Sequence, residues 1–139
     1  MILKTARIPL IVVLAMAAGM GPVFPSLAES AVQVQEYQGV SYVSGGIGLE
    51  EREELQSMAS QFNLKLTFAM RSGDYISYVA VRITDTKGGT VLEATANGPL
   101  FYARLGQGSY KVQVSAAGQD FQRSVQVRSS QAQLDFYWN

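Results

Sequence analysis

The sequence predicts a mainly β protein, an antiparallel β-sandwich of about seven strands with one short N-terminal helix. From residue 63 to the C-terminus, apolar and polar residues alternate with a period of two, as they do in strands that bury one face. Turns that contain glycine interrupt the alternation roughly every 8–12 residues, a spacing typical of sandwiches and small barrels. Upstream of residue 63, one apolar stretch follows a helical spacing instead.

Residues 1–28 form a predicted export signal that precedes this fold. Two basic residues start the segment, residues 8–18 form an apolar run, and Ser26-Leu27-Ala28 offers small residues at the two positions that a signal peptidase reads. We therefore expect the signal to be cleaved, the mature chain to begin near Glu29, and the protein to be periplasmic or secreted.

A retained membrane anchor is the alternative to cleavage. A spanning helix needs about 20 apolar residues, whereas this run carries Pro9 and is closed by glycines and prolines between residues 19 and 25. A bacterial lipid anchor is excluded because the chain has no cysteine to carry it. We expect no stable membrane insertion after signal cleavage.

Composition limits the functions that remain. Of 139 residues, 47% are hydrophobic and 16% are charged, which suits one globular domain with a packed core. Without the signal, nine basic residues stand against eleven acidic ones, a net charge of −2 with no basic face for nucleic acid. The chain has neither Cys nor His, so disulfides, the usual metal ligands and the common nucleophilic triads are missing. We expect no metal, no cofactor and no enzymatic activity.

The segment 29–62 is expected to pack on a sandwich formed by residues 63–139. Residues 31–37 alternate like a half-buried strand, and a glycine cluster follows at 44–48. A helix is predicted over 49–62, and its apolar face consists of Leu55, Met58, Ala59 and Phe62.

Glu50, Glu51, Glu53 and Glu54 crowd the predicted start of that helix. Such a cluster can be an acid/base pair or a set of Ca²⁺ ligands, but the unpaired N–H groups of a first turn also favour acidic residues. We interpret the four carboxylates as an exposed helix start that faces water. The preceding Gly45-Gly46-x-Gly48 lacks the context of a phosphate-binding loop, and the adjacent glutamates repel anions.

The remaining chain reads as a series of strands separated by turns. The predicted strands are residues 64–70, 79–84, 90–95, 100–105, 110–114, 121–128 and 131–138. Side chains on the apolar phase of these strands are expected in the core: Leu66, Phe68, Val81, Ile83, Leu105, Tyr110, Val112 and Val114. In the last strand the alternation assigns Phe136 and Trp138 to the core and Tyr137 to the surface.

Aromatic residues in the β-rich half provide the candidate binding surface. Strand alternation is expected to bury about half of them and to expose the others. We select Phe101, Tyr102 and Tyr137 as the candidate surface for a ligand or partner.

One family resemblance rests on turn glycines and alternating core positions. The matching residues are Val79-x-Val81-x-Ile83-x-Asp85-x-x-Gly88, Asn97-Gly98, Ala103-x-Leu105, Gly108-x-Tyr110-x-Val112-x-Val114, Gly118 and Val125-x-Val127. This pattern, over residues 64–128, resembles the carboxypeptidase regulatory-like domains, which are Ig-like, prealbumin-like (transthyretin-like) β-sandwiches. The chain departs from the family at Gln107, where such domains often carry a turn proline.

The upstream segments 42–52 and 63–69 extend the resemblance to residues 42–138. They are similar to the N-terminal half of small exported proteobacterial proteins described as carboxypeptidase regulatory-like domain-containing. The resemblance implies a periplasmic location and supplies no catalytic residue.

Two functions agree with these observations. The first is a non-catalytic interaction or structural module of the bacterial cell envelope, which engages an envelope protein through a sheet edge or a loop end. The alternative is a small module that binds carbohydrate or another envelope ligand through exposed aromatic residues. An exposed aromatic platform favours the second function, and a long bare edge strand favours the first.

Overall fold

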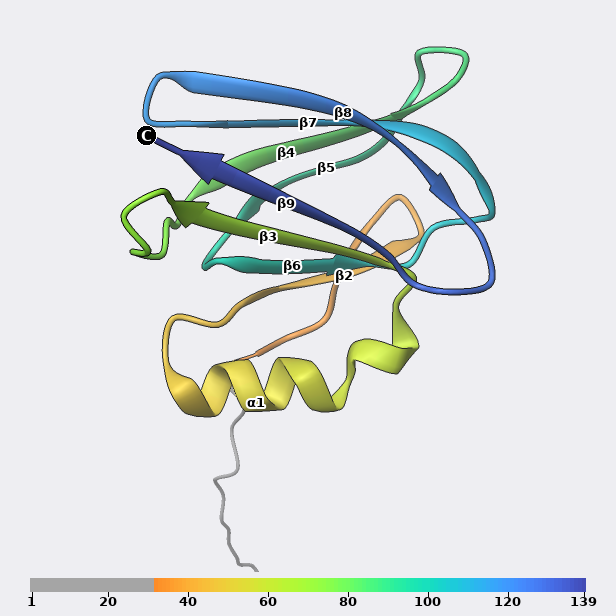
Figure 1. The fold of residues 1–139 in the computed structure, drawn as a ribbon. Coiled ribbons are helices and arrows are strands. Elements are labelled where there is room, and N and C mark those ends of the chain that lie inside the picture. Colours follow the sequence, from red (N-terminus) through yellow and green to blue (C-terminus); the bar gives the residue numbers. More distant parts are fainter. Residues whose placement is uncertain (1–31) are drawn as a thin grey trace, which may run out of the picture. The chain divides into compact units, whose positions relative to one another are not determined.

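The structure, a computed structural model, describes residues 32–139, so the predicted export signal and its cleavage site lie outside the described residues. Two β-sheets pack face to face, and helix α1 (Leu49–Ser57) covers the outer side of one of them (Figure 1). The predicted fold class, a β-sandwich with one short helix, is confirmed. The described part contains nine strands rather than about seven.

The first sheet has the strand order β1-β2-β6-β3-β9. Its strands are β1 (Gln35–Tyr37), β2 (Val40–Gly45), β6 (Leu100–Ala103), β3 (Leu64–Met70) and β9 (Ala132–Trp138). The second sheet has the order β5-β4-β7-β8, with β5 (Thr90–Ala96), β4 (Val79–Asp85), β7 (Gly108–Ala116) and β8 (Gln119–Val127). Neighbouring strands are antiparallel throughout, except that β3 and β9 run parallel.

The main core lies between the two sheets. Seven of the eight predicted core residues are buried, each with an exposed fraction of at most 4%. Tyr110 is only half-buried, because its side chain reaches the sheet end, where the hydroxyl donates to the Gly106 carbonyl oxygen at 2.7 Å. Phe136 and Trp138 are buried and Tyr137 is exposed, as the alternation in the last strand predicts.

A second, smaller core lies between the first sheet and α1. It consists of Val32, Val43, Leu55, Phe62, Leu100 and Tyr102. The helix predicted over 49–62 is too long: α1 ends at Ser57, and a 3₁₀ turn, η3 (Ala59–Gln61), follows. The Met58 N–H bonds to the Leu55 carbonyl at 3.1 Å, the tighter hydrogen-bond pattern that ends many helices. Leu55 and Phe62 nevertheless face the sheet, as predicted.

The N-terminal segment contributes strands to the first sheet. The strand predicted at 31–37 begins later, at Gln35, and β2 was not predicted at all. β2 pairs with β6, and Val43 in its middle is fully buried. The sequence predicts no element between residue 37 and the glycine cluster at 44–48, whereas pairing with β6 makes residues 40–45 a strand.

Candidate functional site

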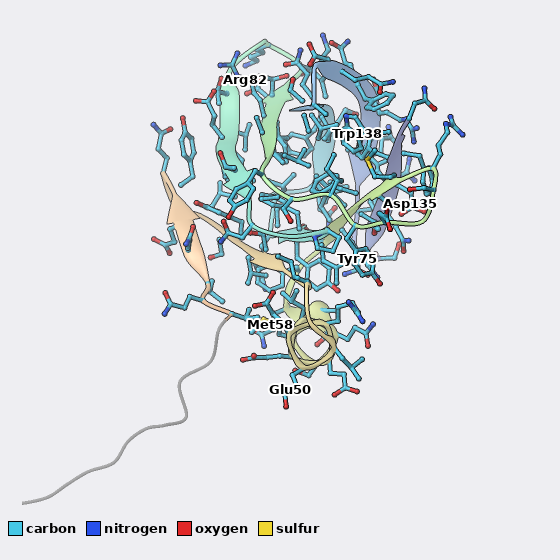
Figure 2. The ribbon with its side chains drawn as sticks, turned by 90° about the vertical axis from the view of Figure 1, so that its left-hand side faces the viewer. Glu50, Met58, Tyr75, Arg82, Asp135 and Trp138 are labelled. Atoms are coloured by element: carbon cyan, nitrogen blue, oxygen red, sulfur yellow. The ribbon has the colours of Figure 1, made fainter. Side chains whose placement is uncertain are left out.

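Helix α1 covers only half of the outer face of the first sheet. Beneath it lie Val43, Leu100 and Tyr102 from β2 and β6. On the other half of this face, the strand register places three residues of β3 beside three residues of β9: Lys65 with Gln133, Thr67 with Asp135, and Ala69 with Tyr137. None of these six residues is buried. Figure 2 looks along α1 and shows Tyr75 and Asp135 above the helix and to its right.

Two exposed tyrosines flank an alanine at the end of this open half. Ala69 pairs with Tyr137 of β9 on one side and forms an antiparallel bridge with Tyr75 on the other. Directly paired residues carry their side chains on the same face of a sheet, and two strand spacings separate the tyrosines by about 10 Å. Tyr75 is 52% exposed and Tyr137 is 47% exposed. We call Tyr75, Ala69 and Tyr137 the tyrosine face.

Charged groups border the tyrosine face. The Arg52 guanidinium of α1 lies 5.0 Å from the centre of the Tyr75 ring, a cation–π contact. Its Nη1 also donates to the carbonyl oxygens of Gly46 and Ile47, both at 3.1 Å, so the guanidinium is held in place. One row away, the Asp135 carboxylate accepts a hydrogen bond from the Gln133 side-chain amide at 3.3 Å. This arrangement places two exposed rings, one of them covered on one face by Arg52, beside polar groups.

Two of the three residues that we predicted as a ligand surface are inside the protein. Phe101 and Tyr102 are both 0% exposed, so the prediction that they form a surface is corrected. The reason is that β6 lies in the middle of the first sheet, with the second sheet on one side and α1 on the other. Strand alternation leaves no exposed side in such a strand. Only Tyr137 of the predicted set lies on the surface.

The buried Tyr102 is unusual because its hydroxyl has no hydrogen-bond partner among the described residues. Burial raises the pKa of its phenol. The Lys65 ammonium lies 5.8 Å from the ring centre and contacts the π-face of the ring.

Sequence reasoning missed two exposed tyrosines in the segment 71–78 that follows β3. Tyr75 joins the tyrosine face, and Tyr78 is the most exposed large hydrophobic side chain of the described residues, at 75%. The φ angle of Tyr78 is 59°, a left-handed conformation that bulky residues rarely adopt. The available signal was two aromatic residues in a stretch that follows neither strand nor helix periodicity.

The glycine loop before α1 already holds an anionic group, which the protein itself supplies. The Glu51 Oε1 atom accepts hydrogen bonds from the backbone N–H of Gly46 at 2.6 Å and of Ile47 at 3.3 Å. The prediction that all four glutamates face water is therefore wrong for Glu51, which fastens the loop. Across residues 32–139, no cluster of three or more acidic residues is arranged to hold a metal ion.

The comparisons with known proteins identify no family. No protein-family model matches the chain, and no curated protein sequence matches it. Within the described range, none of the helices has the length and apolar character needed to cross a membrane. The likeness to carboxypeptidase regulatory-like domains stays a prediction.

Proposed function

We propose that this chain is an exported, non-catalytic binding module of the bacterial cell envelope, and that its tyrosine face binds carbohydrate. The observation that carries the proposal is the row Tyr75, Ala69 and Tyr137, in which two exposed rings stand on one sheet face with a small residue between them. Export and envelope location rest on the predicted signal at residues 1–28 and on the family resemblance.

The chemistry of this row suits a sugar ring. A pyranose presents an apolar C–H surface that packs on aromatic rings, and its hydroxyl groups bond to polar groups at the rim. Here Arg52 and Asp135 supply a donor and an acceptor beside the rings. Ala69 leaves room between the rings, where a larger side chain on β3 would fill the space.

The edge strands β8 and β9 are a poor template for pairing with a strand of another protein, which favours this proposal. The Trp138 indole N–H donates to the Gln119 carbonyl of β8 at 3.1 Å. The Arg123 guanidinium donates to the Asp135 carbonyl of β9 at 3.1 Å and lies 4.9 Å from the Phe136 ring centre. Each edge strand therefore has one backbone acceptor engaged by the protein's own side chains, which hinders the addition of a foreign strand at that position.

Polysaccharide binding by the purified protein tests the proposal. Soluble fragments of peptidoglycan, chitin and cellulose are titrated against the wild type and the variants Tyr75→Ala, Tyr137→Ala and Tyr78→Ala. Each of the first two substitutions is expected to weaken binding about fivefold, since one ring contact contributes about 1 kcal/mol. Tyr78→Ala is the matched control, because its ring is exposed but lies outside the row. Equal affinity of all four proteins, or no binding to any glycan, would contradict the proposal.

Protein interaction through β8 is the second candidate. β8 is nine residues long and forms one edge of the second sheet, so it is the longest edge strand among the described residues. Apart from Gln119, its outward backbone groups offer a template for strand addition. Hydrogen exchange distinguishes the two candidates: a protein partner protects the amides of β8, whereas a glycan protects those around Ala69 and Tyr137.

A further inference from the structure

A polar pocket of ≈ 250 Å³ lies at the end of β3 that is remote from the tyrosine face. Two arginines, Arg104 and Arg128, line it together with Ser60, Gln107 and Ser129 and with the residues 61–63. Asn63 directly precedes β3 and Ala69 lies near its other end, so roughly 20 Å of strand separates the pocket from the tyrosine face.

Among the described residues, the pocket is lined by two positive charges and by no negative one. No acidic residue lines it, and the single ion pair within residues 32–139 joins Arg82 to Glu93 on the second sheet. Both arginines are exposed, and an anion bound between them is attracted by both charges. Guanidinium groups also match the geometry of phosphate and carboxylate oxygens, to which they donate paired hydrogen bonds.

Each arginine makes one hydrogen bond within the described residues and keeps further donors. The Arg104 Nη1 donates to the Gln61 carbonyl oxygen at 3.0 Å, and the Arg128 Nη2 donates to the Gln126 side-chain oxygen. The backbone beside Arg104 is fixed because the Asn63 side chain exchanges two hydrogen bonds with Leu105, at 2.6 and 2.8 Å. A guanidinium has five N–H donors, so each group retains donors for a ligand.

Neutral donors complete the lining. The hydroxyls of Ser60 and Ser129 and the side-chain amide of Gln107 line the pocket, and none of them is engaged in a hydrogen bond among the described residues. We propose that this pocket is a second ligand site, specific for an oxyanion of the phosphate or sulfate type that carries two negative charges. The site is independent of the tyrosine face and does not rest on the proposed carbohydrate function.

Titration with inorganic phosphate, followed by ¹H–¹⁵N NMR of the purified protein at low ionic strength, tests this inference. We expect saturable shifts of the amides of Arg104, Gln107, Arg128 and Ser129. Sodium chloride at the same ionic strength is expected to leave these amide signals unshifted. Glucose 1-phosphate and glucose form further arms: a site for the phosphate group binds the first and not the second.

Three variants make the test specific. Arg104→Gln and Arg128→Gln are each expected to weaken phosphate binding at least tenfold. Arg71→Gln, which removes an exposed arginine at the opposite end of β3, is expected to leave it unchanged. Because Arg104 also bonds to Gln61, its variant is checked for folding by circular dichroism, and Arg128→Gln decides the matter if Arg104→Gln does not fold. Unchanged affinity in Arg128→Gln, or shifts scattered over all exposed lysines and arginines, would overturn the inference.

Discussion

Single polar atoms determine where this small protein gains or loses stability. The Tyr102 hydroxyl is buried, whereas the Tyr110 hydroxyl lies at an exposed end of its sheet. Of the two, only the Tyr110 hydroxyl has an acceptor, the Gly106 carbonyl oxygen at 2.7 Å. The Tyr102 hydroxyl has no partner within the described part of the chain. A buried polar atom without a partner costs free energy relative to its hydrated state in the unfolded chain.

Tyr102→Phe is therefore expected to raise the free energy of unfolding by about 1 kcal/mol. The substitution is also expected to change how the free energy of unfolding depends on pH. Because burial raises the pKa of Tyr102, the unfolded chain loses this proton near pH 10 while the folded protein retains it, so stability falls as the pH rises above about 10. Urea unfolding at pH 7 and pH 10.5 measures both effects, and the alkaline loss should be smaller in Tyr102→Phe.

Tyr110→Phe serves as the control with the opposite sign. It removes a hydrogen bond that the structure contains, and it should lower the free energy of unfolding by about 1 kcal/mol at pH 7. If Tyr102→Phe destabilises the protein as much as Tyr110→Phe does, the Tyr102 hydroxyl has a partner in solution.

Gly98 is the residue at which a side chain has no room. A Cβ atom there would lie 2.5 Å from the Gly45 carbonyl oxygen, a backbone atom that cannot move without shifting β2. Gly98→Ala should therefore destabilise the protein by about 2 kcal/mol, the usual cost of overpacking. Gly48, whose added Cβ would meet nothing within 4 Å, is the matched site. It is the N-cap of α1, where Ala is less favourable than Gly, so Gly48→Ala should cost less than about 1 kcal/mol. Thermal unfolding of the two variants measures the difference, and equal melting temperatures would disprove the close approach.

At the scale of elements, the alternation of apolar and polar residues correctly predicts strands with one buried face. It fails for strands that are buried on both faces. β3 begins and ends at the predicted residues because Leu64, Leu66 and Phe68 are buried while the residues between them are not. β6 is buried on both faces, so the exposure predicted for Phe101 and Tyr102 could not be correct. The tyrosine face was not predictable either, because Tyr75 meets Ala69 through a loop that folds back on β3.

At the start of α1, too, the sequence pattern does not predict which residue makes the important contacts. The structure predicts the order in which substitutions there reduce stability. Composition predicts four equivalent glutamates, but only Glu51 binds the backbone N–H groups of Gly46 and Ile47. Glu51→Ala should cost about 1–3 kcal/mol, since it leaves these donors unpaired, whereas the exposed Glu50→Ala should cost less than about 0.5 kcal/mol. Leu55→Ala should cost more than either, about 2–5 kcal/mol, because Leu55 is fully buried. Urea unfolding of the three variants gives the order, and similar losses for Glu50→Ala and Glu51→Ala would show that the loop is not fastened in solution.

At the scale of the whole molecule, β3 connects the two proposed sites and the second core. Its first residues adjoin the arginine pocket, its last residues form the floor of the tyrosine face, and its neighbour β6 supports α1. The parallel pairing with β9 brings Tyr137, near the C-terminus, beside Ala69. Both proposed sites therefore depend on the first sheet, which the segment before residue 63 helps to build.

This dependence predicts that the described residues unfold as one unit. The division expected from the sequence treats 29–62 as a segment packed on a sandwich of residues 63–139. In the structure, however, removing that segment takes away β2, the partner of β6, along with the helix that covers Leu100 and Tyr102. In a chain that begins at Asn63, β6 would have an unpaired edge, and its apolar outer face would be exposed. We expect this shortened chain not to fold.

Hydrogen exchange of the intact protein and NMR of the shortened chain test this prediction together. In the intact protein, the amides of Val43 in β2 and Leu66 in β3 should exchange with the same free energy of opening, because the strands that contain them separate only when the whole sheet unfolds. The shortened chain should give a spectrum without the dispersion of a folded β-protein. A dispersed spectrum of the chain from Asn63, or a Val43 amide that exchanges far more readily than Leu66, would show that the sandwich is stable without its N-terminal strands. In that case β2 and α1 would be a cover on a completed fold, and the tyrosine face could be studied without them.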